Sequence, residues 1–152
     1  MPKPAALYFW CSNGFIIYID NLMKSLYAMK RPYWVSDDIK AEHCSLGFGN
    51  PSGHMFNNVF FYVSVYLHLY HEVGVKQPRM SVFCTAYIVK MAGTCIGVTF
   101  LIFMGFSRVY LGAHSINQVI FGTLLGVVFA LVGHYKAKPL FLGMPEYLYS
   151  DS

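Results

Sequence analysis

Residues 114–134 read HSINQVIFGTLLGVVFALVGH and contain no Asp, Glu, Lys or Arg. A helix needs about 20 predominantly apolar residues to cross the hydrocarbon core of a bilayer. The stretch has that length, and Gly122 and Gly126 in it have the small-x3-small spacing that lets helices approach closely in lipid. The sequence therefore predicts a membrane-spanning helix here.

Three further apolar stretches precede this one. The first carries Asp20 and Lys24 in its final third, near the expected membrane interface, and the third carries a single charge, Lys90. We expect Lys90 either to form a structural pair, with Asp20 as a candidate partner, or to snorkel to the interface. The predicted fold class is all-α, a polytopic transmembrane helix bundle forming a single membrane domain over residues 1–152, with about four spanning helices (residues 7–29, 54–70, 80–106 and 114–134) and a polar loop (33–50).

The composition supports a membrane protein and excludes several other classes. Charged residues make up 12% of the 152 residues, against roughly 25% in soluble domains, and mean hydropathy is +0.45. These values exclude disorder, collagen and a charged coiled coil. The net charge of +4 is mild and scattered, so no nucleic-acid partner is expected. The 4 cysteines form no CxxC pair, so neither a zinc site nor a disulfide framework is indicated.

If all four stretches span, three short polar motifs fall on one side of the membrane. With Lys24, Arg31 and Arg108 set aside because they belong to these motifs, basic residues near the helix ends number two on the motif side and five on the other. The two are Lys30 and Lys40, and the five are Lys3, Lys76, Arg79, Lys136 and Lys138. The positive-inside rule then places both termini in the cytoplasm and the motifs in a lumen or outside. No A-x-A cleavage pattern follows the first stretch, so we expect it to be mature sequence.

The three motifs bring cations and histidines to one membrane face. They are Lys24-x6-Arg31-Pro32, Pro51-Ser52-Gly53-His54 and Ser107-Arg108-x5-His114.

Such a set suits phosphate chemistry. Three cations can neutralise a phosphate dianion, with the two arginines as planar forks and the lysine as a point charge. The N–H groups of Gly53 and His54 at a helix start, with the Ser52 hydroxyl, add an anion cradle. One histidine can attack phosphorus while the other protonates the leaving oxygen. The cations take the place of a metal ion, so we expect neither metal nor cofactor.

The three motifs, in this order and spacing, resemble the signature motifs of the type 2 phosphatidic acid phosphatase (PAP2) superfamily. The resemblance covers about residues 24–133. It implies a helical phosphatase in which His114 is the phosphohistidine-forming nucleophile and His54 the general acid for the leaving group. The phosphate binders implied by the resemblance are Lys24, Arg31, Ser52, Gly53 and Arg108.

Two features depart from the usual family pattern. Members usually place an Asp four residues after the nucleophile, where this chain has Gln118, whose amide oxygen can orient the His114 ring but brings no charge. Gln at this position, Arg31-Pro32-Tyr33-Trp34 and Cys44-x2-Gly47-x-Gly49 before Pro51 resemble the glucose-6-phosphatase branch. The family core usually has six helices, and the resemblance implies that this chain lacks the first two. The substrate pocket is therefore expected either to be incomplete or to be completed by membrane protein partners that supply these helices.

The sequence thus predicts an integral membrane phosphatase that acts on a phosphate monoester, with a sugar phosphate such as glucose 6-phosphate favoured. The resemblance implies an endoplasmic reticulum or other internal membrane, with the site facing the lumen. A lipid phosphate phosphatase is the first alternative, because motif residues bind the phosphate and not the leaving group. A non-catalytic PAP2-derived subunit of a larger membrane complex is the second. A fragment of a longer phosphatase would share the predicted mechanism.

Overall fold

The computed structural model describes residues 3–39, 47–73 and 80–149, and this part of the chain forms helices and loops with no strand. The elements are α1 (Lys3–Tyr27), the 3-10 helix η1 (Pro32–Trp34), α2 (Gly53–His68), the π-helix η2 (Leu69–Val73), α3 (Met80–Tyr110), α4 (Ile116–Val132), the π-helix η3 (Gly133–Ala137) and α5 (Lys138–Tyr149). The predicted all-α class is confirmed. Residues 40–46 of the predicted polar loop, with Cys44, lie outside the described residues.

Local backbone chemistry explains where the helices end. Ala28 adopts a φ of 44° just after α1, which interrupts the helix before Met29. At the end of α3, helical bonding continues through Ser107, so the helix reaches Tyr110 rather than Phe106 and turns at Gly112, where φ is 64°. Helix α4 begins at Ile116 because Ser115 caps it. His114 therefore lies in the loop before the helix.

Two helical stretches, Tyr87–Tyr110 and Ile116–Gly143, are long and apolar enough to cross a membrane. The second runs through α4 and η3 into α5, so it extends beyond the predicted end at residue 134. Helix α2 continues directly into η2, and together they measure about 30 Å, close to the thickness of a hydrocarbon core. The bundle thus has the dimensions of a transmembrane domain.

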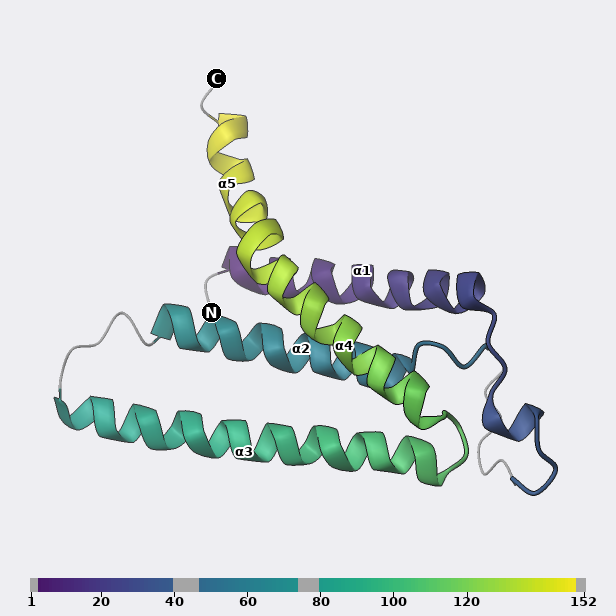
Figure 1. Cartoon of the computed structure of the whole chain (residues 1–152). Coiled ribbons are helices and arrows are strands. Elements are labelled where there is room, and N and C mark those ends of the chain that lie inside the picture. Colours follow the sequence, from purple (N-terminus) through teal and green to yellow (C-terminus); the bar gives the residue numbers. More distant parts are fainter. Residues whose placement is uncertain (1–2, 40–46, 74–79, 150–152) are drawn as a thin grey trace.

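Helix α2 is the central element of the bundle. In Figure 1, α1 and α3 run alongside α2, and α4 crosses it obliquely before the chain continues into α5. The buried core lies where α1, α2 and α4 meet, and its members are Ile16, Phe56, Phe60 and Ala130. A β-carbon on Gly122 would lie 2.7 Å from the carbonyl oxygen of Ser52, and one on Gly126 would lie 2.9 Å from that of Phe56. The two glycines therefore permit the close crossing of α2 and α4.

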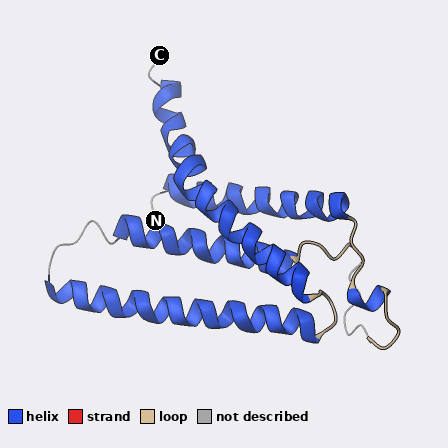
Figure 2. Ribbon diagram, in the orientation of Figure 1, coloured by secondary structure: helices blue, strands red, loops and turns tan. Residues whose placement is uncertain are grey.

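All the segments that carry the three motifs lie at one end of the bundle. Figure 2 shows the loop after α1, the start of α2 and the connection between α3 and α4 gathered there. Two hydrogen bonds join these segments through the main chain: Gly49 N–H donates to Met29 O at 2.8 Å, and Ser52 N–H donates to Gln118 O at 3.1 Å. The loops are therefore held together independently of their charged side chains.

Candidate active site

His114 is buried at this end, with 4% of its surface exposed. Its Nδ1 lies 2.8 Å from the carbonyl oxygen of Gly49. A carbonyl can only accept, so Nδ1 carries the ring proton and Nε2 carries the lone pair. Nε2 in turn lies 3.4 Å from Nη1 of Arg31, which donates to it. The ring is therefore fixed in one tautomer, with its unprotonated nitrogen facing a cation.

Arg31 is equally buried, and its guanidinium is held by main-chain carbonyls. It donates from Nε to Gly47 O at 2.7 Å, from Nη1 to Ala113 O at 3.0 Å and from Nη2 to Phe48 O at 3.4 Å. These acceptors come from the loop before α2 and from the loop before α4. Burial lowers the pKa of Arg31 below its ordinary value, but arginine stays protonated in proteins. The group is thus a fixed positive charge beside Nε2 of His114.

The environment keeps His114 neutral. Burial, and then the positive charge of Arg31, lower the pKa of His114 from 6.5 to about 4. The hydrogen bond to Gly49 and the nearby Gln118 side chain act in the opposite direction with smaller effect. At neutral pH the ring is therefore uncharged, with the proton on Nδ1 and a basic lone pair on Nε2.

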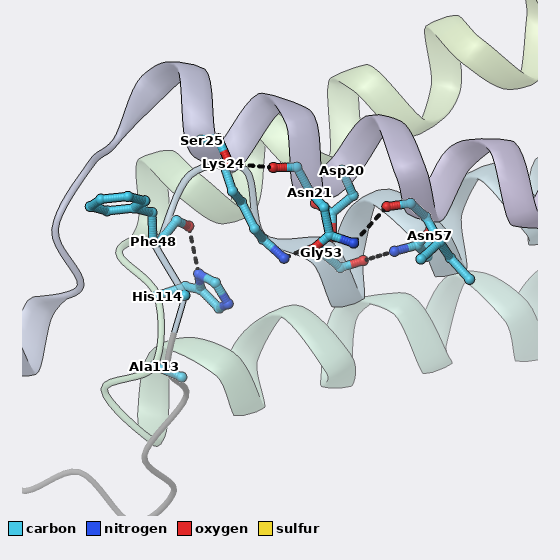
Figure 3. Close-up of polar contacts among 12 residues, drawn as sticks. Asp20, Asn21, Lys24, Ser25, Phe48, Gly53, Asn57, Ala113 and His114 are labelled. Atoms are coloured by element: carbon cyan, nitrogen blue, oxygen red, sulfur yellow. Dashed lines mark hydrogen bonds and ion pairs between the residues drawn. The ribbon is translucent and has the colours of Figure 1, made fainter.

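Lys24 reaches the start of α2 from α1. Its Nζ forms an ion pair of 2.7 Å with Asp20, one helical turn earlier and 4% exposed. A β-carbon on Gly53 would lie 2.7 Å from Lys24 Nζ and would collide with Asp20 Oδ2. Figure 3 shows the lysine side chain extending toward Gly53. Only glycine thus lets the ion pair sit against the first turn of α2.

Several buried oxygens at this end lack a hydrogen-bond partner within the described residues. They are Ser52 Oγ, Asp20 Oδ1 and Asn57 Oδ1. Asn57 sits next to the same turn, because its Nδ2 donates to Gly53 O at 2.8 Å. A buried hydroxyl without a partner is costly unless a ligand or water completes it. Ser52 Oγ therefore fits a donor to a bound anion.

Gln118 is buried, and its side chain links two of the motif-bearing loops. Its Oε1 accepts from Ser115 N–H at 3.1 Å and its Nε2 donates to Lys30 O at 3.1 Å. A β-carbon on Gly49 would lie 2.7 Å from Gln118 Nε2. His114 donates its Nδ1 proton to the carbonyl oxygen of Gly49. The sequence had led us to expect the side-chain oxygen of Gln118 as the group that orients the ring. Gln118 supports the peptide that holds the ring.

Arg108 and His54 complete the set. Arg108 contacts His114 through the main chain, where His114 N–H donates to Arg108 O at 3.2 Å, and among the described residues neither the Arg108 nor the His54 side chain bonds to the His114 ring. Arg108 is half-buried at the end of α3, and its Nε donates to Ser107 Oγ at 3.3 Å. His54 is exposed in the first turn of α2, within the field of Arg108, Lys24 and Arg31. The two histidines thus differ: one is buried and the other open to solvent.

A cavity of about 520 Å³ adjoins His114. Its wall includes Asp38, Ser115, Val109 and Ile116. A second, apolar groove of about 690 Å³ runs between α2, α3 and α4, and it too is lined by Val109 and Ile116. The polar cavity and the apolar groove therefore meet beside the histidine. Among the described residues, no group of three or more His, Cys, Asp or Glu side chains is arranged to hold a metal ion.

The sequence missed two parts of this arrangement. Asp20 was a candidate partner for Lys90, whereas it pairs with Lys24, and Lys90 lies over the ring of Tyr70. The four-residue spacing of Asp20 and Lys24 on one helix was the available signal. The role of the Gly49 carbonyl as the acceptor from His114 could not be predicted from the sequence, because every residue type carries the same main-chain acceptor.

Fold and site together define a helical membrane protein with a buried centre of positive charge. The chain belongs to the PAP2 superfamily, whose family model matches residues 5–140. Its fold is similar to the crystal structure of the first transmembrane PAP2 type phosphatidylglycerolphosphate phosphatase from Bacillus subtilis, with a TM-score of 0.65 and 22% sequence identity. That match covers 93% of this chain and 59% of the Bacillus chain, so this chain spans less than two thirds of that protein. No curated protein matches the sequence.

Proposed function

We propose that the protein is an integral membrane phosphatase that hydrolyses a phosphate monoester through a phosphohistidine on His114, without a metal ion. The observation that carries this proposal is the state of His114. Its Nδ1 is engaged by Gly49 O at 2.8 Å, and its Nε2 faces Arg31 with the lone pair free of a proton. A buried, neutral and oriented imidazole is the form of histidine that attacks phosphorus.

The first step follows from the positions of the charges. A phosphate dianion entering between Lys24, Arg31 and Arg108 replaces the weak 3.4 Å contact between Arg31 and His114 Nε2. Arg31 itself stays in place, because its shorter bonds to Gly47 O and Ala113 O remain. Nε2 then attacks phosphorus, the P–N bond forms and the bond to the leaving oxygen breaks. His54, which has taken up a proton from solvent, gives that proton to the leaving oxygen.

The second step returns the enzyme to its starting state. His54, now neutral, accepts a proton from a water molecule as that water attacks the phosphohistidine. The P–N bond breaks and inorganic phosphate forms. His54 is exposed and exchanges protons with solvent, whereas His114 is buried and is protected from competing protonation. The different exposure of the two histidines supports this division of roles.

For the leaving group we propose a sugar, as in the glucose-6-phosphatase branch that the motifs resemble. The cavity of about 520 Å³ beside His114 has a carboxylate, Asp38, and a hydroxyl, Ser115, in its wall. These groups can accept hydrogen bonds from sugar hydroxyls. With this substrate we also propose an endoplasmic reticulum or other internal membrane, a site facing the lumen and both termini in the cytoplasm.

A lipid phosphate is the second candidate substrate, and a specific observation favours it. The apolar groove of about 690 Å³ reaches the cavity at Val109 and Ile116. An acyl chain in the groove would place its phosphate beside His114. Only 6% of the apolar stretch of α3 is buried in the protein, so this helix leaves a surface for lipid or for a membrane partner that adds further helices.

Trapping the intermediate tests the proposed mechanism. Purified protein is incubated with a phosphate ester labelled on phosphorus and quenched in alkali, and the labelled peptide is mapped. We expect label on His114, no label in His114→Ala, and retained label in His71→Ala, which changes a histidine in η2, beyond the C-terminal end of α2. Absence of label with sugar and lipid esters alike would refute the phosphatase mechanism and favour a non-catalytic subunit.

The leaving group is tested with two variants that change one wall each. Asp38→Asn alters the polar cavity, and Thr123→Phe narrows the apolar groove at a position outside that cavity. For a sugar phosphatase, Asp38→Asn lowers turnover of glucose 6-phosphate and Thr123→Phe does not. For a lipid phosphatase, Thr123→Phe lowers turnover of lysophosphatidate, and glucose 6-phosphate is not hydrolysed by the parent protein.

A further inference from the structure

A third hollow, a cleft, lies between the C-terminal half of α2 with the start of η2 and the N-terminal half of α3, away from His114. Its volume is about 230 Å³, and its lining includes Tyr62, Tyr66, Leu69, Tyr70, Lys90 and Gly93. Among the described side chains, the lining combines one cation with aromatic and aliphatic groups and includes no carboxylate. Nothing in the proposed phosphatase mechanism uses this cleft.

Lys90 is the charged residue among the described side chains of the lining. It is half-buried, and its Nζ lies 5.0 Å from the centre of the Tyr70 ring. In the described part of the chain no carboxylate lies within ion-pair distance of it, since the one ion pair there joins Lys24 and Asp20. A cation over an aromatic ring is stabilised by only about 0.5–2 kcal/mol, so its charge is left available for an anion.

A ladder of tyrosines holds the cleft open. Tyr62 stacks on Tyr66 with ring centres 6.3 Å apart, and Tyr66 stacks on Tyr70 at 6.2 Å. The Tyr62 hydroxyl donates to the carbonyl oxygens of Thr94 at 3.2 Å and Gly93 at 3.3 Å, which ties α2 to α3 at one end of the cleft. The ladder thus offers a preformed wall of rings with phenol hydroxyls.

The position of Lys90 along α3 indicates the level of the membrane at which the cleft lies. Arg108 follows Lys90 by 18 residues on the same helix, a rise of about 27 Å at 1.5 Å per residue. This is close to the roughly 30 Å thickness of a hydrocarbon core. With Arg108 at the interface that carries the His114 site, Lys90 lies at the opposite interface. Lipid phosphates are located at that level, and tyrosines are enriched there.

We propose that this cleft binds an anionic phospholipid of the leaflet opposite the His114 site, with the headgroup phosphate on Lys90 and an acyl chain along the tyrosine ladder. Charge complementarity favours this occupant over a zwitterionic lipid, because the described side chains of the lining supply a cation for the phosphate and no carboxylate for a choline. The proposal concerns a separate site and holds whether or not the chain hydrolyses phosphate esters.

Competition between two lipids tests the proposal. The protein in detergent is mixed with phosphatidylglycerol and phosphatidylcholine of matched chains, and bound lipid is counted by native mass spectrometry. Phosphatidylglycerol is a phosphodiester, so the proposed monoesterase does not consume it. We expect a preference of about fivefold for phosphatidylglycerol, the factor that corresponds to about 1 kcal/mol per basic residue near anionic lipid.

The variants separate this site from general surface charge. Lys90→Met removes the preference, and Lys136→Met, which removes an exposed lysine outside the cleft, keeps it. Gly93→Leu keeps Lys90 and fills the cleft from a position where an added β-carbon meets nothing within 4 Å. Gly93→Leu is expected to lower lipid binding. It therefore tests the proposal even if Lys90→Met does not fold. Equal preference in the parent and Lys90→Met, or equal binding of phosphatidylglycerol in the parent and Gly93→Leu, would overturn the proposal.

Discussion

The imidazole of His114 donates its Nδ1 proton to the main-chain carbonyl of Gly49 at 2.8 Å, across 65 residues of sequence. The same bond fixes the tautomer of the ring and leaves Nε2 as its basic nitrogen. A side-chain carboxylate in this position would place a negative charge beside the ring. A carbonyl orients the ring without adding a charge to the site. The geometry of the candidate nucleophile thus depends on the position of one peptide group.

Moving that peptide is expected to slow the reaction more than it weakens binding. In Gly49→Ala the new β-carbon would lie 2.7–3.0 Å from the side-chain amide of Gln118, so either the Gly49 peptide or this amide must shift, and the amide is held by Ser115 N–H and Lys30 O. A shift of about 1 Å can cost about a hundredfold in rate. We expect kcat to fall ten- to hundredfold with KM within about threefold, measured by steady-state hydrolysis of a phosphate ester.

Gly47→Ala is the matched control for this change. Gly47 lies two residues earlier, and its carbonyl also serves the site by accepting from Arg31 at 2.7 Å. A β-carbon at Gly47 meets nothing within 4 Å, so its peptide can stay in place. Equal losses in Gly47→Ala and Gly49→Ala would show that the bond from His114 to Gly49 is not the cause.

The low pKa of His114 predicts a specific titration. Burial and the charge of Arg31 lower this pKa to about 4. The ring therefore stays neutral from neutral pH down to about 5, and its protonation shift in NMR of histidine-labelled protein is expected near pH 4. In Arg31→Gln the loss of the positive charge raises the pKa of His114 toward 6.5. Arg108→Gln is the control, because Arg108 is not among the charges that act on this ring.

The same shift makes stability depend on pH. The unfolded chain takes up a proton at this histidine near pH 6.5 and the folded chain only near pH 4. Stability is therefore full above about pH 6.5 and is lost as the pH falls through this window. His114→Gln should show a flatter decline in Tm between pH 7 and pH 4.5. An identical decline in both proteins would contradict the low pKa.

The ion pair between Lys24 and Asp20 predicts a rescue of stability without a rescue of activity. Removing Lys24 leaves a buried carboxylate without its cation, a change that typically costs about 3–5 kcal/mol. Lys24→Met should therefore lower Tm strongly, and Lys24→Met with Asp20→Asn should recover most of the loss. Phosphate hydrolysis should stay low in both, because the cation is absent.

The single variant Asp20→Asn isolates the role of the carboxylate in holding Lys24. We expect a raised inhibition constant for inorganic phosphate with little change in Tm, because an amide holds the lysine less firmly than a carboxylate does. Asn21→Ala changes the neighbouring exposed residue, whose amide bonds only to Ile17 O within its own helix. It should leave both quantities unchanged. Tighter phosphate binding in Asp20→Asn would rule out the positioning role.

The sequence was sufficient for the fold class because lipid imposes a simple rule. Apolar stretches of about 20 residues must be helical to satisfy their backbone groups in a membrane. Helix ends were less predictable. The helix α3 passes Phe106 to Tyr110, because no breaker precedes Gly112, and α4 starts after the Ser115 cap rather than at His114. Such ends depend on single hydrogen bonds that hydropathy does not detect.

Side-chain chemistry at the site was predictable, but its supports were not. Arg31 and His114 were expected from their motifs, and the structure brings them within 3.4 Å. The carbonyls of Gly47, Gly49 and Ala113 that hold them have no residue-type signature, since every residue carries the same acceptor. Recognising them required the path of the loops in space.

Gln118 provides the last prediction, because its four hydrogen bonds join three loops. Its main chain accepts from Ser52 N–H and donates to Ser115 Oγ, and its side chain bonds Ser115 N–H and Lys30 O. In Gln118→Ala the last two groups lose their partner in part-buried hydrogen bonds, which typically contribute about 0.5–1.5 kcal/mol each. We expect a lower Tm and a fall in kcat, measured on the same preparation.

Gln118→Asp tests whether the amide or a charge is required at this position. The shorter side chain cannot both cap Ser115 and donate to Lys30 O, because a carboxylate is an acceptor only. It should therefore lose activity, even though many members of the superfamily are expected to carry Asp here. Asn117→Ala, an exposed amide one residue earlier, should behave like the parent protein. A gain in kcat for Gln118→Asp would mean that the carboxylate, and not Gly49 O, accepts the hydrogen bond from His114 Nδ1. That result would contradict the orienting role of the main chain.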